Sequence, residues 1–179
     1  MNLEKAIKIA VEAHTGQVDK GGNPYILHPL RVMLSLDTEE ERIVGVLHDV
    51  VEDCAPEGYR WDRDGFSHFH KLSKEHQPKR NTWEHLIAEG LDENLFDALQ
   101  SVSKTPEEEK QFKKMDHPNE KRDHYLEFIK RAKFNKIGRN VKAADIRDNL
   151  DISRIDDITQ RDINRLNRYK AAMKMLSDH

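Results

Sequence analysis

The sequence lacks several features that identify whole classes of protein. It has one cysteine, Cys54, in 179 residues, so no disulfide can form within the chain, which suits a reducing compartment. No stretch approaches the roughly 18 apolar residues that a membrane-spanning helix needs. Charged residues, Glu4, Lys5 and Lys8, interrupt the first apolar run, so we expect no signal peptide. These absences predict a cytoplasmic protein with no membrane partner.

The sequence also lacks an excess of positive charge. Lysine and arginine total 30 against 33 aspartate and glutamate, which gives a net charge of −3. No global positive field therefore exists to attract a nucleic-acid polymer, and any phosphate group must be bound by local residues. The hydrophobic 36% is concentrated in periodic segments, which is typical of a folded helical protein with a charged surface. A chain of this length has room for a single domain with a core, and we expect one domain over residues 1–179.

No segment alternates between apolar and polar residues over the length of a strand. Apolar residues instead recur every three or four positions, so the sequence predicts an all-α bundle of about seven to nine helices. Two polar segments, 55–81 and 104–122, are predicted to be insertions. The second is expected to be exposed and mobile, interrupted by Pro118, although Thr105 to Glu108 carries the signals of a helix start.

The segment from Glu41 to Cys54 combines apolar residues with several ionisable ones. Its apolar side chains cover most of a helical circumference, which predicts one central helix, and Thr38 with Glu41 predicts a capping box at its start. His48 and Asp49 would then be buried, and Glu52 and Asp53 would lie one turn further on. Buried ionisable groups need a partner, so a metal site is expected here, with an ordinary ion network as the alternative.

Two further places carry polar residues in apolar surroundings. His28 stands before Pro29 at the expected start of a helix, which we place from Pro29 to about Leu36. Asp145 follows two alanines, whose small side chains allow a neighbouring helix or a metal to come close. Together with the His48-Asp49 pair, these residues offer two nitrogen and two carboxylate ligands, a set that suits Mn²⁺, Fe²⁺, Zn²⁺ or Co²⁺.

Three segments in this order resemble a known family. They are PYILHP at 24–29, LHDVVED at 47–53 and VKAADIRDNLD at 141–151. The pattern of a histidine, a His-Asp pair and a distant aspartate resembles the HD superfamily of metal-dependent phosphohydrolases. The residues of the three segments are similar to those of the RelA/SpoT-type hydrolases of guanosine bis-diphosphate (ppGpp), which include small alarmone hydrolases. The resemblance covers 6–54 and 125–176 and implies an HD-domain helical bundle.

The resemblance implies a specific metal and substrate. In the family, the residues matching His28, His48, Asp49 and Asp145 bind one Mn²⁺ ion. The implied reaction is hydrolysis of the 3′-pyrophosphate of ppGpp, a small nucleotide. The resemblance leaves the oligomeric state open.

The resemblance also implies roles for residues around the metal. The acids matching Glu52 and Asp53 act on the attacking water, which agrees with the help that a carboxylate one turn from the metal ligands can give. The residue matching Asn149 contacts the ribose, and the residue matching Lys20 faces a phosphate or the base.

The chain departs from the family pattern at three positions near these motifs. Asp19 stands where the family has an arginine that helps to hold the purine, Cys54 replaces a threonine, and Asp148 replaces a histidine. The departure at Asp19 leaves other functions open. They are a phosphomonoesterase or phosphodiesterase acting on another nucleotide, and a non-catalytic module that binds a nucleotide around a metal.

Overall fold

The computed structural model describes residues 1–56, 70–71, 79–153 and 157–178, and the regular structure in this part of the chain is helical. It contains ten helices and no β-strand, apart from one isolated bridge between Val18 and Pro24. Eight of the helices have eight residues or more, so the predicted all-α bundle of seven to nine helices is confirmed. The predicted insertion at 55–81 lies mostly outside the described residues.

The N-terminal part forms one side of the bundle. It consists of α1 (Leu3–Ala13), α2 (Leu27–Leu34), α3 (Glu39–Leu47) and α4 (Val50–Cys54). The Asn2 side chain accepts a hydrogen bond from Lys5 N and caps α1. Helix α2 begins two residues earlier than expected, so His28 lies within its first turn. The α3 helix contacts both α1 and α2, and these contacts form the first half of the core.

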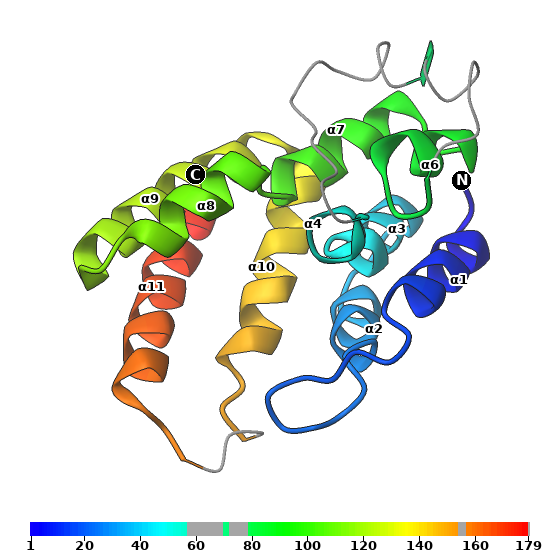
Figure 1. Ribbon diagram of the computed structural model, residues 1–179. Helices are drawn as coiled ribbons and strands as arrows, with labels where there is room; N and C mark the ends of the chain where they lie inside the picture. Colours follow the sequence, from blue (N-terminus) through cyan, green and yellow to red (C-terminus); the bar gives the residue numbers. More distant parts are fainter. Residues whose placement is uncertain (57–69, 72–78, 154–156, 179) are drawn as a thin grey trace.

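The C-terminal part forms the other side of the bundle. It consists of α6 (Trp83–Ala88), α7 (Glu93–Val102), α8 (Pro106–Lys114), α9 (Pro118–Phe134), α10 (Lys136–Leu150) and α11 (Gln160–Ser177). Figure 1 shows α10 in the middle of the molecule, between α2 and α3 on one side and α9 and α11 on the other. It contacts all four of these helices and α7 as well. One face of α10 therefore lies against the N-terminal half, and the opposite face lies against α9 and α11.

The predicted central helix from Glu41 to Cys54 is wrong in one respect, because it is two helices. Helix α3 ends at Leu47 and α4 starts at Val50, while the capping box between Thr38 and Glu41 is present as predicted. On one regular helix, the neighbouring side chains of His48 and Asp49 would diverge by about 100°. The break lets both side chains turn to the same point.

The segment 104–122 was expected to be exposed and mobile, but the structure makes most of it helical. Thr105 and Glu108 form a capping box that starts α8, and the helix is interrupted after Lys114, as expected, before Pro118 begins α9. Proline is favoured there because the first turn needs no donor from its nitrogen. Glu108 also pairs with Arg131 of α9 at 2.8 Å, which ties α8 to α9. The exposure was predicted correctly, since α8 buries none of its residues.

Gly138 allows α10 to approach α7 closely. A Cβ atom at this position would lie 1.9 Å from Ser101 Oγ and 3.2 Å from Ser101 Cβ. The first contact is impossible unless Ser101 shifts and the second is tight, so glycine fits this position and a larger residue strains it. Within the described residues, no helix is both long and apolar enough to cross a membrane.

We expect Gly138→Ala to destabilise the fold by roughly 1–3 kcal/mol, the usual cost of overpacking a close contact between helices. Urea unfolding measures the loss. Ser101→Ala provides the matched background, because it removes the Oγ atom at 1.9 Å and leaves the contacts with Ser101 Cβ at 3.2 Å and with Ala98 O at 3.4 Å. The double variant should lose less from the glycine change than the single variant does. Equal losses in the two backgrounds would show that the Ser101 hydroxyl is not the obstacle.

Candidate metal centre

Two histidines and two aspartates from three parts of the fold meet between α2, α3, α4 and α10. His28 Nε2 lies 3.3 Å from Asp145 Oδ1 and 3.7 Å from Asp49 Oδ2. His48 Nε2 lies 3.0 Å from Asp49 Oδ2 and 3.7 Å from Asp145 Oδ1. Each imidazole nitrogen therefore faces both carboxylates. The four residues predicted from the sequence as metal ligands are in contact in the structure.

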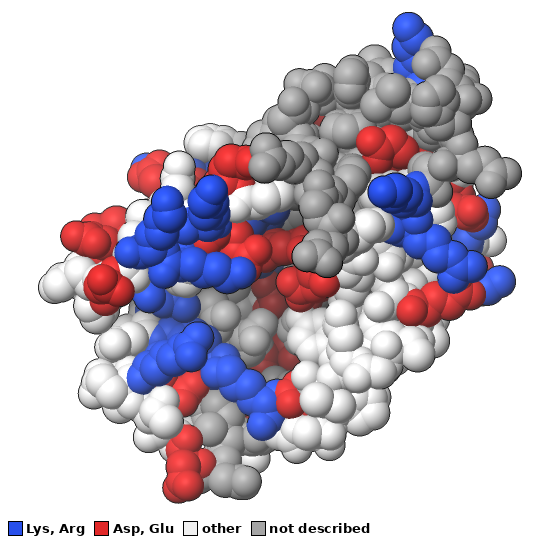
Figure 2. All heavy atoms as spheres, in the orientation of Figure 1, with Lys and Arg blue, Asp and Glu red and all other residues white. Residues whose placement is uncertain are grey.

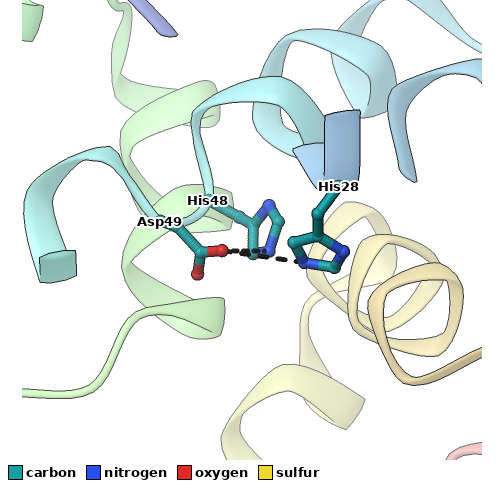
Figure 3. Close-up of side chains that lie close together, drawn as sticks. All are labelled: His28, His48 and Asp49. Atoms are coloured by element: carbon teal, nitrogen blue, oxygen red, sulfur yellow. Dashed lines mark ion pairs between the residues drawn. The ribbon is translucent and has the colours of Figure 1, made fainter. Parts of the chain in front are cut away.

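Three of these residues form the tightest group. One ligand atom each from His28, His48 and Asp49 lie within 4.8 Å of one another. Figure 3 shows both rings turned toward the same oxygen of Asp49, from α2 on one side and from the junction of α3 and α4 on the other. The arrangement is compact enough for one ion to contact all three.

The His48 ring is held by its own helix. Its Nδ1 lies 2.7 Å from Gly45 O, so this nitrogen carries the hydrogen and donates it. The other nitrogen, Nε2, is buried and has no hydrogen-bond partner among the described residues, although Asp49 Oδ2 is near. A buried Nε2 that faces a carboxylate is satisfied by a proton of its own or by a bound cation.

The His28 ring is held by α10. Its Nδ1 lies 2.7 Å from Asp148 Oδ2, and Arg31 donates to both oxygens of the same carboxylate, at 2.6 and 3.0 Å. Nε2 of His28 then points at Asp145 and Asp49. Both predicted histidine ligands thus have Nδ1 engaged and Nε2 directed into the cluster.

Asp145 and Asp49 carry further hydrogen bonds that fix their carboxylates. Lys142 Nζ lies 2.7 Å from Asp145 Oδ2, and Asn149 Nδ2 donates to Asp145 Oδ1 at 2.6 Å. Tyr25 OH donates to Asp49 Oδ2 at 2.7 Å. The oxygens that face the histidines are therefore held in place from outside the cluster.

The cluster requires positive charge. Burial lowers the pKa of His28, but the hydrogen bonds with Asp145 and Asp148 outweigh burial and raise it to about 10. Burial raises the pKa of Asp145, but Lys142 and the two histidines hold it well below its usual range. The carboxylates are thus ionised, and without a metal a proton on His28 supplies the cation. A divalent ion supplies more charge with both imidazoles neutral.

The next turn carries Glu52 and Asp53, which have different surroundings. Glu52 accepts a hydrogen bond from Lys104 N at 2.8 Å on one oxygen and pairs with Lys104 Nζ at 2.5 Å on the other. Asp53 is exposed in the pocket, where partial desolvation and the charges of Asp49 and Glu52 raise its pKa to about 7. The two acids predicted to act on the attacking water are therefore placed side by side, but Glu52 is already occupied by a lysine.

The cluster opens into a pocket of about 390 Å³. Its walls include every residue predicted from the sequence as ligand, catalytic acid or substrate contact, except the fully buried His48. Four cationic side chains line the same pocket, and they are Lys20, Lys104, Lys142 and Arg165. In Figure 2, Lys and Arg side chains gather on the side formed by α8, α9 and α11, beside acidic side chains nearer the middle of the face. The pocket thus places positive charge next to an acidic cluster.

Lys20 and Asp19 lie in the loop between α1 and α2. Lys20 Nζ pairs with Asp162 Oδ1 of α11 at 3.2 Å, which links this loop to the C-terminal helix. Asp19 Oδ1 accepts hydrogen bonds from Gly21 N and Asn23 N, both at 2.9 Å. The carboxylate that departs from the family pattern therefore holds its own loop together.

Four residues of the site were not predicted from the sequence. Tyr25 and Asp148 lie inside the quoted motifs, but only their partners Asp49 and His28 reveal what they do. Lys104 and Lys142 occur in polar or mixed segments, where a solvated lysine is the ordinary expectation. The one available signal was at Lys142, which lies three residues before Asp145 on the same helical face.

Comparisons with known proteins agree with the three motifs. No family model matches the chain. Over 55 residues it is 46% identical to a putative GTP diphosphokinase from the chloroplast of Arabidopsis thaliana. Over 56 residues it is 45% identical to the guanosine-3′,5′-bis(diphosphate) 3′-pyrophosphohydrolase of Borreliella burgdorferi, and 38% identical to the Vibrio cholerae protein of the same name.

These similarities cover a limited part of each protein. They span 28 to 29% of this chain and 6 to 8% of the relatives. The chain therefore corresponds to a small fraction of the length of the relatives that it matches. Within that part, the resemblance to the RelA/SpoT-type hydrolases is confirmed.

We expect Asp49→Ala to abolish metal binding, because Asp49 Oδ2 faces both histidine nitrogens, at 3.0 Å from His48 Nε2 and 3.7 Å from His28 Nε2. Metal that binds only the folded state stabilises it by mass action, so adding Mn²⁺ should raise the melting temperature of the wild type and not of the variant. Elemental analysis after dialysis measures the metal directly. Glu84→Ala, which replaces an acid on α6, is the matched control and should behave like the wild type. Equal metal content in Asp49→Ala and the wild type would contradict the assignment.

Proposed function

We propose that residues 1–179 form a single divalent-metal-dependent phosphohydrolase domain, which hydrolyses the 3′-pyrophosphate of ppGpp or a related nucleotide. The observation that carries the proposal is a cluster of two imidazoles and two carboxylates that opens into a pocket with four cationic side chains. The relatives that bear the name of a ppGpp 3′-pyrophosphohydrolase support the choice of substrate. A pocket of about 390 Å³ is of the size that holds a small-molecule ligand, which supports a small nucleotide as the substrate.

His28, His48, Asp49 and Asp145 would hold the ion, and we propose Mn²⁺. Imidazole and carboxylate together suit Mn²⁺, and no thiolate, which would favour zinc, lies among these four residues. Such an ion lowers the pKa of a bound water and stabilises negative charge on a phosphoryl oxygen. The residues of the chain then have to place the substrate and handle the proton.

Lys104 and Lys142 are placed to bind the phosphates. Both line the pocket, and each is paired with a carboxylate of the site, Glu52 or Asp145. The ring of Phe128 lies beneath both ammonium groups, 5.5 Å from Lys104 Nζ and 5.0 Å from Lys142 Nζ. A lysine held between a carboxylate and an aromatic face keeps its charge in a partly buried place. It can share that charge with a pyrophosphate group next to the ion.

Asp53 and Glu52, which the resemblance links to the attacking water, have different roles in this proposal. Asp53 faces the pocket and is placed one helical turn beyond Asp49, so it can orient the attacking water and accept its proton. Both oxygens of Glu52 contact Lys104, so Glu52 acts chiefly by holding this lysine. Asn149 also lines the pocket, beside Asp145, where we place the ribose, and Lys20 lines it from the loop between α1 and α2, where we place the base or the 5′-phosphates.

The substrate can be tested with a panel of nucleotides. Protein loaded with Mn²⁺ is incubated with ppGpp, pppGpp, nucleoside monophosphates and cyclic nucleotides, and phosphorus NMR identifies the products. We expect pyrophosphate from ppGpp and pppGpp and no turnover of the other compounds. Release of orthophosphate from a monophosphate, or opening of a cyclic nucleotide, would make the chain a different nucleotide hydrolase. No product from any of them, with metal bound, would favour a binding module.

The division of roles between the two acids can be tested by their amides. Asp53→Asn should retain metal and lose roughly 10²–10⁴-fold in kcat, the usual contribution of general acid-base help. Glu52→Gln keeps an oxygen for Lys104 N but loses the charge that holds Lys104 Nζ, so we expect a changed KM and a kcat within roughly tenfold of wild type. An equally large fall in kcat for Glu52→Gln would give Glu52 a direct role. Loss of metal in either variant would make that residue a ligand.

A further inference from the structure

We propose that Asp148 is a positioning residue that holds His28 in the form able to bind the metal, an inference that rests on the proposed metal centre. The observation is the contact of 2.7 Å between His28 Nδ1 and Asp148 Oδ2. Asp148 contacts the ring at Nδ1, whereas Nε2, on the other side of the ring, faces Asp145 and Asp49. It would therefore act on the ion through the histidine.

The Asp148 carboxylate is fixed before any metal binds. Arg31 Nε donates to Oδ1 at 2.6 Å, and Arg31 Nη2 donates to Oδ2 at 3.0 Å. This two-point contact sets the plane of the carboxylate and keeps it ionised. An ionised carboxylate only accepts hydrogen bonds, so Nδ1 of His28 must carry the hydrogen. The lone pair of neutral His28 is then on Nε2, which faces Asp145 and Asp49.

The two histidines differ in the partner that orients them. His48 Nδ1 donates to Gly45 O, a neutral carbonyl of its own helix, whereas His28 Nδ1 donates to a charged group on another helix. A carboxylate partner makes an imidazole a stronger donor to a metal than a carbonyl does, besides fixing the ring. Asp148 should therefore contribute to metal affinity and not only to the shape of the site.

Helix α10 supplies both the ligand and the positioning group. Asp145 and Asp148 are three residues apart, so they share one face of the helix and both meet His28, at Nε2 and Nδ1 respectively. The ring is thus clamped between two carboxylates of one rigid helix. A shift of α10 relative to α2 would move both contacts together, which couples the packing of the two halves to the metal site.

The test compares Mn²⁺ binding by wild type, Asp148→Asn and the control Asp151→Asn. Asp151 lines the same pocket and accepts a hydrogen bond from Ser153 N, so its replacement removes one carboxylate charge from the pocket wall. Dissociation constants are measured by competition with a chelator, and melting temperatures are measured in excess chelator. We expect Asp148→Asn to weaken Mn²⁺ binding by roughly 10- to 100-fold and Asp151→Asn by less than about threefold. The metal-free melting temperature of Asp148→Asn should fall, because its pairing with Arg31 and His28 is lost, so the dissociation constants are compared at a temperature where all three proteins are folded.

Wild-type affinity in Asp148→Asn would overturn the proposal, as would an equal loss in both variants, which would indicate a general effect of charge. Should Asp148→Asn not fold, nitrogen NMR of the wild type loaded with Zn²⁺ decides the question. We expect His28 to show a protonated Nδ1 and a metal-bound Nε2, and a metal-bound Nδ1 would refute the role of Asp148. Failure of the proposed substrate leaves these results unaffected, because none of them measures hydrolysis.

Discussion

The burial of His28 and His48 against two ionised aspartates is the constraint on which the rest of the site depends. Four ionisable groups cannot share an apolar interior unless their charges balance and their remaining polar atoms find partners. The protein meets this demand with contacts from outside the cluster: Tyr25 to Asp49, Lys142 to Asp145 and Asp148 to His28. A bound divalent ion would complete the balance. The surroundings of the ligands are therefore as much a part of the metal centre as the ligands themselves.

Helix α10 makes these contacts possible because small residues let it lie close to its neighbours. Gly138 brings its first turn against Ser101 of α7, and Ala144 packs in the core that includes the N-terminal helices. Near the start of α10, the Asn140 side chain also donates a hydrogen bond of 2.6 Å to Glu41 of α3. The N-terminal ligands and the ligand from α10 can meet only if this packing is correct. Substitutions at Gly138 should thus affect metal binding as well as stability.

Features that depend on residues close together in the chain could be predicted from the sequence. The caps at Thr38 and Thr105 are local hydrogen bonds, so they could be predicted from neighbouring residues, and the all-α class follows from the spacing of apolar positions. The break at His48 and Asp49 could not be predicted in this way, because it accompanies contacts of both side chains with His28, which lies in another helix. The partners of Glu52 and His28 lie 52 and 120 residues away, and no local pattern reports such contacts.

Asp19 illustrates how a departure from a family pattern can change meaning once its contacts are known. An arginine at this place would offer a cation to the purine, whereas Asp19 accepts two backbone hydrogen bonds that close the loop from 19 to 23. The negative charge is thus partly satisfied by the loop, and it repels a nearby phosphate less than a free carboxylate would. Replacing Asp19 by arginine would add a cation and remove these two bonds at once. Asp19→Asn, which keeps an oxygen acceptor, is therefore the change that isolates the effect of charge on nucleotide binding.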